Sequence, residues 1–244
     1  MYKIAAEQLP CVFHVSARTV STHALNIFGD HSDVMACRQT GFAMLCEGNV
    51  QEVMDLSPVA HLAALSGKVP FINFFDGFRT SHEIQKIAVW DYKDLADMCD
   101  MDAVKAFREH ALNPEHPAMR GSHENGDTFF QHREACNQYY DALPEVVEKY
   151  MGKINEKLGT DYKLFNYYGA PDADRVIIAM GSICDVAEEV IDYLNAHGEK
   201  VGLIKVRLYR PFKAERLIEA IPATAKKIAV LDRTKEPGAQ GEPC

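Results

Sequence analysis

The sequence lacks the features that mark membrane, secreted and metal-binding proteins. No apolar run approaches the roughly 18–20 residues that span a bilayer, and residues 1–8 lack the basic-then-apolar order of a signal peptide. No two of the seven cysteines stand as C-x-x-C, the spacing typical of zinc ribbons and iron–sulfur ligands. We therefore expect reduced thiols, a cytoplasmic location and no membrane partner.

Basic charge is also scarce. The chain has 26 lysines and arginines against 35 aspartates and glutamates, a net charge of −9, and no basic block. Because nucleic acids and anionic membranes attract positive charge, we expect no nucleic-acid partner. The other values, 244 residues with 47% hydrophobic and 25% charged, are typical of a soluble globular protein of one or two domains.

Standard catalytic signatures are absent as well. The chain contains no G-x-G-x-x-G, no G-x-x-x-x-G-K-[ST] and no G-x-S-x-G. Asp30, His31 and Asp33 could supply metal ligands from one loop, but a hydrogen-bonded loop is the favoured interpretation. We therefore expect no catalytic residue and no metal site in this segment. If the protein takes part in catalysis, a cofactor supplies the reactive atom.

A strand–helix–strand pattern organises the first half of the chain. Residues 42–45 and 69–75 are short apolar runs that predict buried strands, and residues 11–17 predict a third. Between the apolar runs, helical spacing predicts a helix over 50–67, capped by Asn49 and kinked or interrupted at Pro58. A βαβ unit of this kind implies a parallel sheet.

The rest of this half is less regular. Residues 24–28 predict a short helix, and residues 94–112 predict a longer one. Pro144 is expected in the first turn of a helix that ends at Gly159.

A second α/β pattern follows, with a boundary near residue 160. Strands and helices alternate in the order β-α-β-α-β, over residues 175–180, 183–194, 201–208, 213–220 and 228–231. We therefore expect two units, 1–160 and 161–244. Because each predicted sheet needs further elements to cover its faces, we expect the chain to be truncated at both ends.

Two loops follow predicted strand ends, the position where parallel sheets place ligands. Arg18 offers a planar fork suited to a carboxylate or phosphate, although a structural ion pair with an acidic loop is equally open. Residues 74–83 gather aromatic, charged and hydroxyl groups into one connection. This loop predicts either an active-site wall or a domain interface.

Long stretches of the sequence resemble pyruvate:ferredoxin (flavodoxin) oxidoreductases. The resemblance covers essentially the whole chain, and its runs are VFHVSAR (12–18), IFGDHSDV (27–34), RQTGFAML (38–45), residues 74–86, NPEHP (113–117), GLIKVRLYRPF (202–212) and VLDRTKEPG (230–238). The family implies oxidative decarboxylation of pyruvate with coenzyme A to acetyl-CoA and CO₂. It also implies thiamine diphosphate with Mg²⁺, [4Fe-4S] clusters, ferredoxin or flavodoxin as electron partner, and a homodimer when full length.

The resemblance implies a fold and an extent for this chain. The expected fold class is α/β: a thiamine-diphosphate-type pyrimidine-binding domain over 1–160, with a parallel sheet and helices on both faces. A partial transketolase C-terminal-like α/β domain over 161–244 would follow. The family's ring-binding glutamate and substrate threonine would lie upstream of Met1, and the diphosphate–magnesium domain and cluster cysteines downstream of Cys244. The segment would then bind no cofactor completely, and the isolated chain would be inactive.

One site residue carries over from the family. The arginine of the VFHVSAR run is the family's contact to the pyruvate carboxylate, which implies that role for Arg18. The loops that carry His31, Arg38, Asp76, Arg79 and His82 are implied to lie near the active site or the domain interfaces, without individual roles. Two alternatives stay open: a non-catalytic assembly or binding module, and a relative that acts on another 2-oxoacid.

Overall fold

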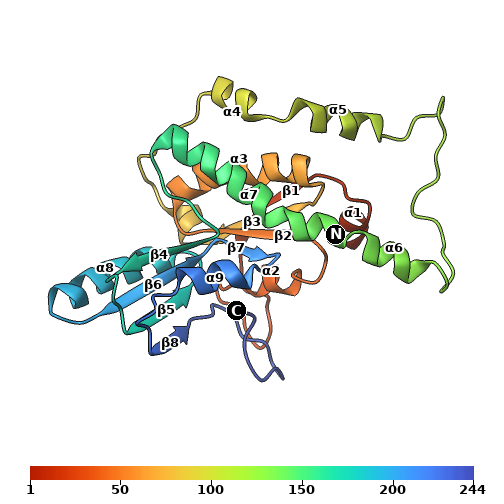
Figure 1. The fold of residues 1–244 in the computed structure, drawn as a ribbon. Coiled ribbons are helices and arrows are strands. Elements are labelled where there is room, and N and C mark those ends of the chain that lie inside the picture. The colour runs from red at the N-terminus through yellow and green to blue at the C-terminus, as the bar shows by residue number, and fades with distance from the viewer.

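The computed structural model describes residues 1–244 as two packed α/β sheets and a long exposed arm (Figure 1). The first half contains α1 (Tyr2–Ala6), β1 (Val12–Ala17), α2 (Ser32–Ala36), β2 (Ala43–Glu47), α3 (Val50–Gly67), β3 (Phe71–Asp76), η1 (Thr80–His82), α4 (Tyr92–Met98), α5 (Met101–Glu109), α6 (Phe129–Ala135) and α7 (Asn137–Leu158). The second half contains β4 (Phe165–Gly169), β5 (Arg175–Ala179), α8 (Ile183–Ala196), β6 (Val201–Val206), β7 (Leu208–Arg210), α9 (Ala214–Ala220) and β8 (Lys227–Val230).

The first sheet has the order β1-β3-β2-β7. Strands β1, β3 and β2 are parallel, as the βαβ pattern predicts, while β7 comes from the second half of the chain and pairs antiparallel with β2. The two faces of this sheet are covered by different helices: α3 with α7 on one side, and α2 on the other (Figure 1). The predicted fold class, a parallel-rich sheet with helices on both faces, is confirmed.

The second sheet has the order β4-β6-β5-β8. Strands β6, β5 and β8 are parallel, and all three were predicted. The strand expected over 201–208 nevertheless ends at Val206, and Leu208 begins β7 of the first sheet. Strand β4, which the sequence analysis missed, pairs antiparallel with β6. Its sequence, FNYYG, alternates weakly and ends on a glycine, so periodicity gave it no clear signal.

Helix α3 runs from Val50 to Gly67 through Pro58, so the predicted interruption there was wrong. The Asn49 side chain caps the helix as predicted, accepting a hydrogen bond from the Glu52 N–H at 2.9 Å. Proline cannot donate to the carbonyl four residues earlier, which is that of Met54. The indole Nε1 of Trp90 donates to this carbonyl at 3.1 Å instead, so the Met54 carbonyl keeps a hydrogen bond.

Three other helix predictions need correction. Residues 24–28 form turns and not a helix, because the Asn26 side chain accepts from the Phe28 N–H at 3.0 Å and offers the backbone a turn. The helix expected over 94–112 is two helices, since Asp100 caps a new one by accepting from Ala103 N–H at 3.0 Å. Pro144 lies inside α7, which begins seven residues earlier at Asn137, whereas Gly159 ends it as predicted.

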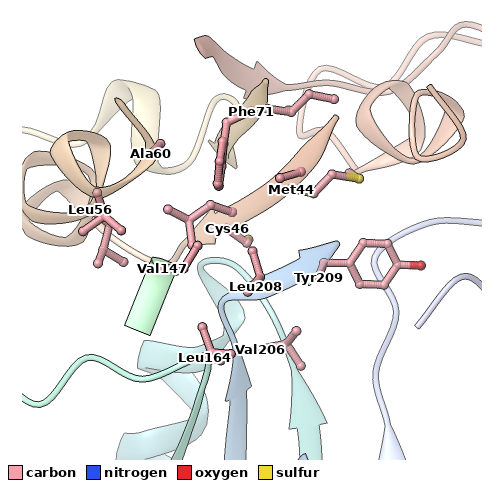
Figure 2. Packing of buried hydrophobic residues seen from close by; sticks show 14 of the residues in the cluster. Met44, Cys46, Leu56, Ala60, Phe71, Val147, Leu164, Val206, Leu208 and Tyr209 are labelled. Carbon is pink, nitrogen blue, oxygen red and sulfur yellow. The ribbon is translucent and has the colours of Figure 1, made fainter. Parts of the chain in front are cut away.

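One hydrophobic core crosses the predicted boundary near residue 160. Figure 2 shows Met44 and Cys46 of β2 beside Leu208 of β7, with Val206 and Leu164 continuing the cluster into the second half. By contrast, no residue from 81 to 142 is buried, and in Figure 1 this segment runs from α4 to α6 away from the two sheets. No helix is both long and apolar enough to cross a bilayer.

Candidate functional site

The carboxyl ends of strands from both sheets face one cavity of about 520 Å³. Its lining comes from the residues that follow β2, β3, β5 and β8: Gly48, Arg79, Glu83, Ser182, Asp185, Asp232 and Arg233 among others. The loop after β3 is tied to the end of β2, because the Thr80 hydroxyl donates to the Gly48 carbonyl at 3.2 Å. This edge is where parallel α/β sheets place ligands.

Asp76, the last residue of β3, is a buried carboxylate that bonds Ser182 and Arg233 of the cavity lining. It is only 2% exposed. One carboxylate oxygen accepts from His31 Nε2, and the other accepts from the Ser182 N–H and from Arg233 Nη1, both at 2.7 Å. His31 belongs to the first half of the chain, whereas Ser182 and Arg233 belong to the second. Asp76 therefore clamps the two halves together at their shared edge.

These contacts decide the charge of Asp76. Burial by itself would raise the pKa of the carboxyl group. The hydrogen bond and charge of His31, the Ser182 N–H and the positive charge of Arg233 outweigh burial and lower that pKa from 3.8 to about 2. Asp76 is consequently an anion under all ordinary conditions.

His31 is buried next to Asp76 and bonded to it. Its side chain is 1% exposed and lies edge-on to the Phe74 ring, with centroids 5.5 Å apart. Because the Asp76 carboxylate only accepts, Nε2 of His31 carries the shared hydrogen. Its Nδ1 atom is buried without a partner. This placement suits a structural bond to Asp76 more than direct contact with a substrate.

Arg18 directly follows β1, and its side chain is exposed and unpaired. Asp33 Oδ2 accepts a hydrogen bond from the Arg18 backbone N–H at 2.9 Å, but no carboxylate forms an ion pair with the guanidinium group. The side-chain stem lies against Gly77, the residue after Asp76. The positive charge of Arg18 is therefore held at the sheet edge without a protein counter-ion.

The remaining predicted residues lie in separate places. Arg79 is exposed and lines the cavity. Arg38 Nη2 donates to both carboxylate oxygens of Glu236, each at 2.8 Å, and this ion pair also joins the two halves of the chain. His82 is exposed, bonded to the Ser81 hydroxyl at 2.8 Å and stacked on Phe78. The structure thus brings His31 and Asp76 into contact, places Arg18 and Arg79 nearby, and separates Arg38 and His82.

The sequence analysis did not single out Arg233, which completes the clamp. Arg233 donates to Asp76, to Ser182 Oγ at 3.1 Å and to the Phe28 carbonyl at 3.0 Å. It lies three residues beyond the end of β8, so a search for charged residues in the loops after parallel strands would have included it.

A second buried group of charges lies at the end of β2. Glu52 receives both Nη atoms of Arg207, at 2.6 and 2.9 Å, and ties α3 to the second half of the chain. Glu47 is fully buried beside this pair, and neither of its carboxyl oxygens has a hydrogen-bond partner. Burial, and then the negative charge of Glu52, raise the pKa of Glu47 well above its usual value. Burial therefore favours the protonated, neutral form of Glu47 in the folded chain.

The residues near the cavity do not fit a magnesium diphosphate. Mg²⁺ needs several oxygen ligands at one point, and no group of three His, Cys, Asp or Glu side chains is gathered in this way. Asp185 already accepts from the Asn49 amide at 3.0 Å, and Asp232 from the Cys244 N–H at 3.1 Å. Asp30, His31 and Asp33 likewise serve separate hydrogen bonds. We therefore assign no metal-holding role to these residues.

Family models match most of the chain. Residues 1–152 match the model described as pyruvate flavodoxin/ferredoxin oxidoreductase, thiamine-diphosphate-binding, and residues 173–243 match pyruvate:ferredoxin oxidoreductase core domain II. A pyruvate:ferredoxin oxidoreductase of Moorella thermoacetica is 63% identical over 243 residues, 100% of this chain and 21% of the relative. A pyruvate-flavodoxin oxidoreductase of Klebsiella pneumoniae matches with the same identity and coverage.

A solved structure gives the same fold. A 2-oxoglutarate:ferredoxin oxidoreductase from Magnetococcus marinus superimposes with a TM-score of 0.60 and 20% identity, over 94% of this chain and 42% of that one. The chain therefore spans about one fifth of the curated relatives it matches, and less than half of the structural neighbour. This chain belongs to the pyruvate flavodoxin/ferredoxin oxidoreductase family.

Proposed function

We propose that this chain is the substrate-orienting part of a thiamine-diphosphate-dependent pyruvate:ferredoxin or pyruvate-flavodoxin oxidoreductase. In the complete enzyme, pyruvate and coenzyme A would give acetyl-CoA and CO₂, with the electrons passing to ferredoxin or flavodoxin. The observation that carries the proposal is Arg18, an unpaired guanidinium at the carboxyl end of β1, in a chain 63% identical over its whole length to enzymes named for pyruvate.

Arg18 would bind the carboxylate of pyruvate. Guanidinium and carboxylate groups match in a planar, bidentate arrangement, and charge-assisted bonds of this kind are stronger than neutral ones. Holding the carboxylate fixes the keto carbon for attack by the cofactor, which supplies the nucleophile. Arg79, exposed in the cavity, would lie on the same edge but has no role assigned to it.

The other components of the reaction would come from elsewhere in the complete enzyme. The Mg²⁺, the diphosphate ligands and the [4Fe-4S] clusters would be held by residues outside 1–244, and the assembly would be a cytoplasmic homodimer. We keep residue 160 as the boundary between a pyrimidine-binding unit and a transketolase C-terminal-like unit. The chain by itself would then have no activity.

A chimera tests the role of Arg18. This chain would replace the matching 243 residues of the Moorella thermoacetica relative, and steady-state kinetics would be measured with pyruvate, 2-oxobutyrate and 2-oxoglutarate. Because a bond to a charged group contributes about 1.5–3 kcal/mol, Arg18→Gln is expected to raise the KM for pyruvate about 10- to 100-fold, and the loss of orientation should lower kcat as well.

The matched control is Arg108→Gln, an exposed arginine on α5 with no side-chain partner, which should leave KM unchanged. An unaltered pyruvate KM in Arg18→Gln would contradict the proposed role. A chimera with higher kcat/KM for another 2-oxoacid than for pyruvate would favour the alternative substrate.

A second candidate function, an assembly module without catalysis, rests on the exposed arm. Residues 81–142 contain no buried side chain, and Ile84, Tyr92 and Met119 are 100%, 87% and 84% exposed. Strongly exposed apolar side chains are a feature of protein interfaces when they gather against a partner. Retention of a full-length relative on immobilised chain, lost when these three residues are changed to serine, would support this function.

A further inference from the structure

Gly77 is a glycine for reasons of space and not of backbone conformation. Its φ angle is outside the left-handed region that favours glycine. A Cβ atom built on Gly77 would nevertheless collide with the Ala17 carbonyl oxygen and with Arg18 Nε, and would lie 2.6 Å from Arg18 Cδ. The place where any other residue would carry its side chain is filled by the Ala17 carbonyl oxygen and by the stem of Arg18.

The pairing of β1 with β3 creates this contact. Ala17 and Asp76 are register partners, and the Gly77 N–H donates to the Ala17 carbonyl at 2.9 Å. The next residue on each strand is Arg18 and Gly77, so the arginine leaves its strand directly over the glycine. Asp76, fixed by His31, Ser182 and Arg233, anchors Gly77 from one side.

Asp33 bonds the backbone of Arg18 and leaves the charge of its guanidinium group unpaired. Its Oδ2 atom accepts from the Arg18 backbone N–H at 2.9 Å, and its Oδ1 atom accepts from Val34 N–H at 2.7 Å. The neighbouring Ser32 hydroxyl accepts from Val20 N–H at 2.8 Å, so the backbone on both sides of Arg18 is fixed. An acid that bonded the guanidinium itself would compete with a substrate carboxylate, whereas one that bonds the backbone does not.

We propose that Gly77 and Asp33 are positioning residues for Arg18: Gly77 provides the surface on which the arginine stem lies, and Asp33 fixes its backbone while leaving the guanidinium unpaired. The inference rests on the proposed substrate role of Arg18. Neither residue touches the substrate, and each acts only through the arginine.

Kinetics of the chimera test the role of Gly77. Gly77→Ala displaces the arginine stem, and an error of about 1 Å in a binding group can cost up to about 100-fold. We expect the KM for pyruvate to rise about tenfold, with the KM for coenzyme A unchanged. The matched control is Gly126→Ala, where a Cβ meets nothing within 4 Å, and its pyruvate KM should not move.

A double-mutant cycle separates positioning from a general structural effect. In the Arg18→Gln background, Gly77→Ala should raise the pyruvate KM no further, because the guanidinium whose placement it disturbs is gone. Equal effects of Gly77→Ala with and without Arg18 would overturn the inference. If Arg18→Gln alone left KM unchanged, the proposed function would fail first, so the two failures are distinguishable.

Asp33 provides the second test, independent of any folding defect in Gly77→Ala. Asp33→Ala removes both acceptors and should raise the pyruvate KM several-fold, whereas Asp33→Asn keeps one acceptor oxygen and should partly restore it. Both effects should vanish in the Arg18→Gln background. An Asp33→Ala chimera with unchanged pyruvate KM would overturn the role of Asp33.

Discussion

Replacing Asp76 by asparagine should remove the electrostatic clamp between the two halves of the chain. The Asp76 pKa is lowered from 3.8 to about 2 by His31, Ser182 and Arg233, against the effect of burial. Each pKa unit corresponds to about 1.4 kcal/mol, so the charged form contributes about 2 kcal/mol to the free energy of unfolding at neutral pH. Asparagine keeps one acceptor oxygen but loses the charge.

The sign of the pH dependence follows from the lowered pKa. A carboxyl group that is more acidic in the folded state stabilises the fold at pH values above 3.8, and this contribution is lost as the pH falls toward 2. The difference between the wild-type chain and Asp76→Asn should therefore be full at pH 7 and shrink in acid. For a domain of this size, about 2 kcal/mol corresponds to a Tm lower by about 4–8 °C.

Urea and thermal unfolding, followed by far-UV circular dichroism at pH 7, 5 and 3, measure this difference. The control is Asp161→Asn, whose carboxylate is 74% exposed and pairs with Lys163 at the surface, where such pairs contribute at most about 1 kcal/mol. The reasoning is refuted if Asp76→Asn is as stable as the wild type at pH 7. It is also refuted if the deficit is the same at pH 7 and pH 3.

Three further changes test other parts of the structure by the same unfolding assays. Glu47→Gln should stabilise the chain increasingly above pH 4.5, by up to about 1.4 kcal/mol per pH unit. The reason is that burial and Glu52 favour the protonated form of Glu47 in the folded chain, whereas the unfolded chain releases the proton. No gain in stability at pH 8 would contradict this. Arg207→Ala should cost about 3–5 kcal/mol, since it leaves Glu52 buried and unpaired, and a loss below 1 kcal/mol would argue against the pair. Asn49→Ala should cost about 1 kcal/mol through loss of the α3 cap, whereas Asn49→Ser should retain most of it.

Local sequence signals predicted most of the elements of both sheets. Strands β1, β2 and β3, helix α3 with its Asn49 cap, and the alternation of β5, α8, β6, α9 and β8 all follow from apolar periodicity and capping residues. Some errors came from local turns and caps, such as those of Asn26 and Asp100, and one arose where a distant partner overrides a local rule. Pro58 breaks no helix because Trp90, 32 positions away, donates to the carbonyl that proline leaves free.

The candidate site was predictable only in part, because local signals mark strand ends but not contacts between distant residues. Arg18 and the loop after β3 were recognisable because both follow strand ends, and the structure places Arg18 against Gly77. The roles of His31 and Asp76 were not, since their bond joins residues 45 positions apart, and the completing contact from Arg233 spans 157 positions. No periodicity in the sequence encodes such contacts.

The site is built from residues on both sides of the boundary near residue 160. Strand β7 leaves the second half to pair with β2, Arg207 crosses to Glu52, and Arg233 crosses to Asp76. Every one of these links reaches the carboxyl-end edge of the first sheet, where Arg18 also stands. The second half therefore fixes the carboxyl-end edge of the first sheet, where Gly77 and Arg18 lie. If the proposed role of Arg18 is right, the geometry that presents its charge to a substrate depends on residues from both sides of the boundary, and neither half alone would hold the arginine in this position.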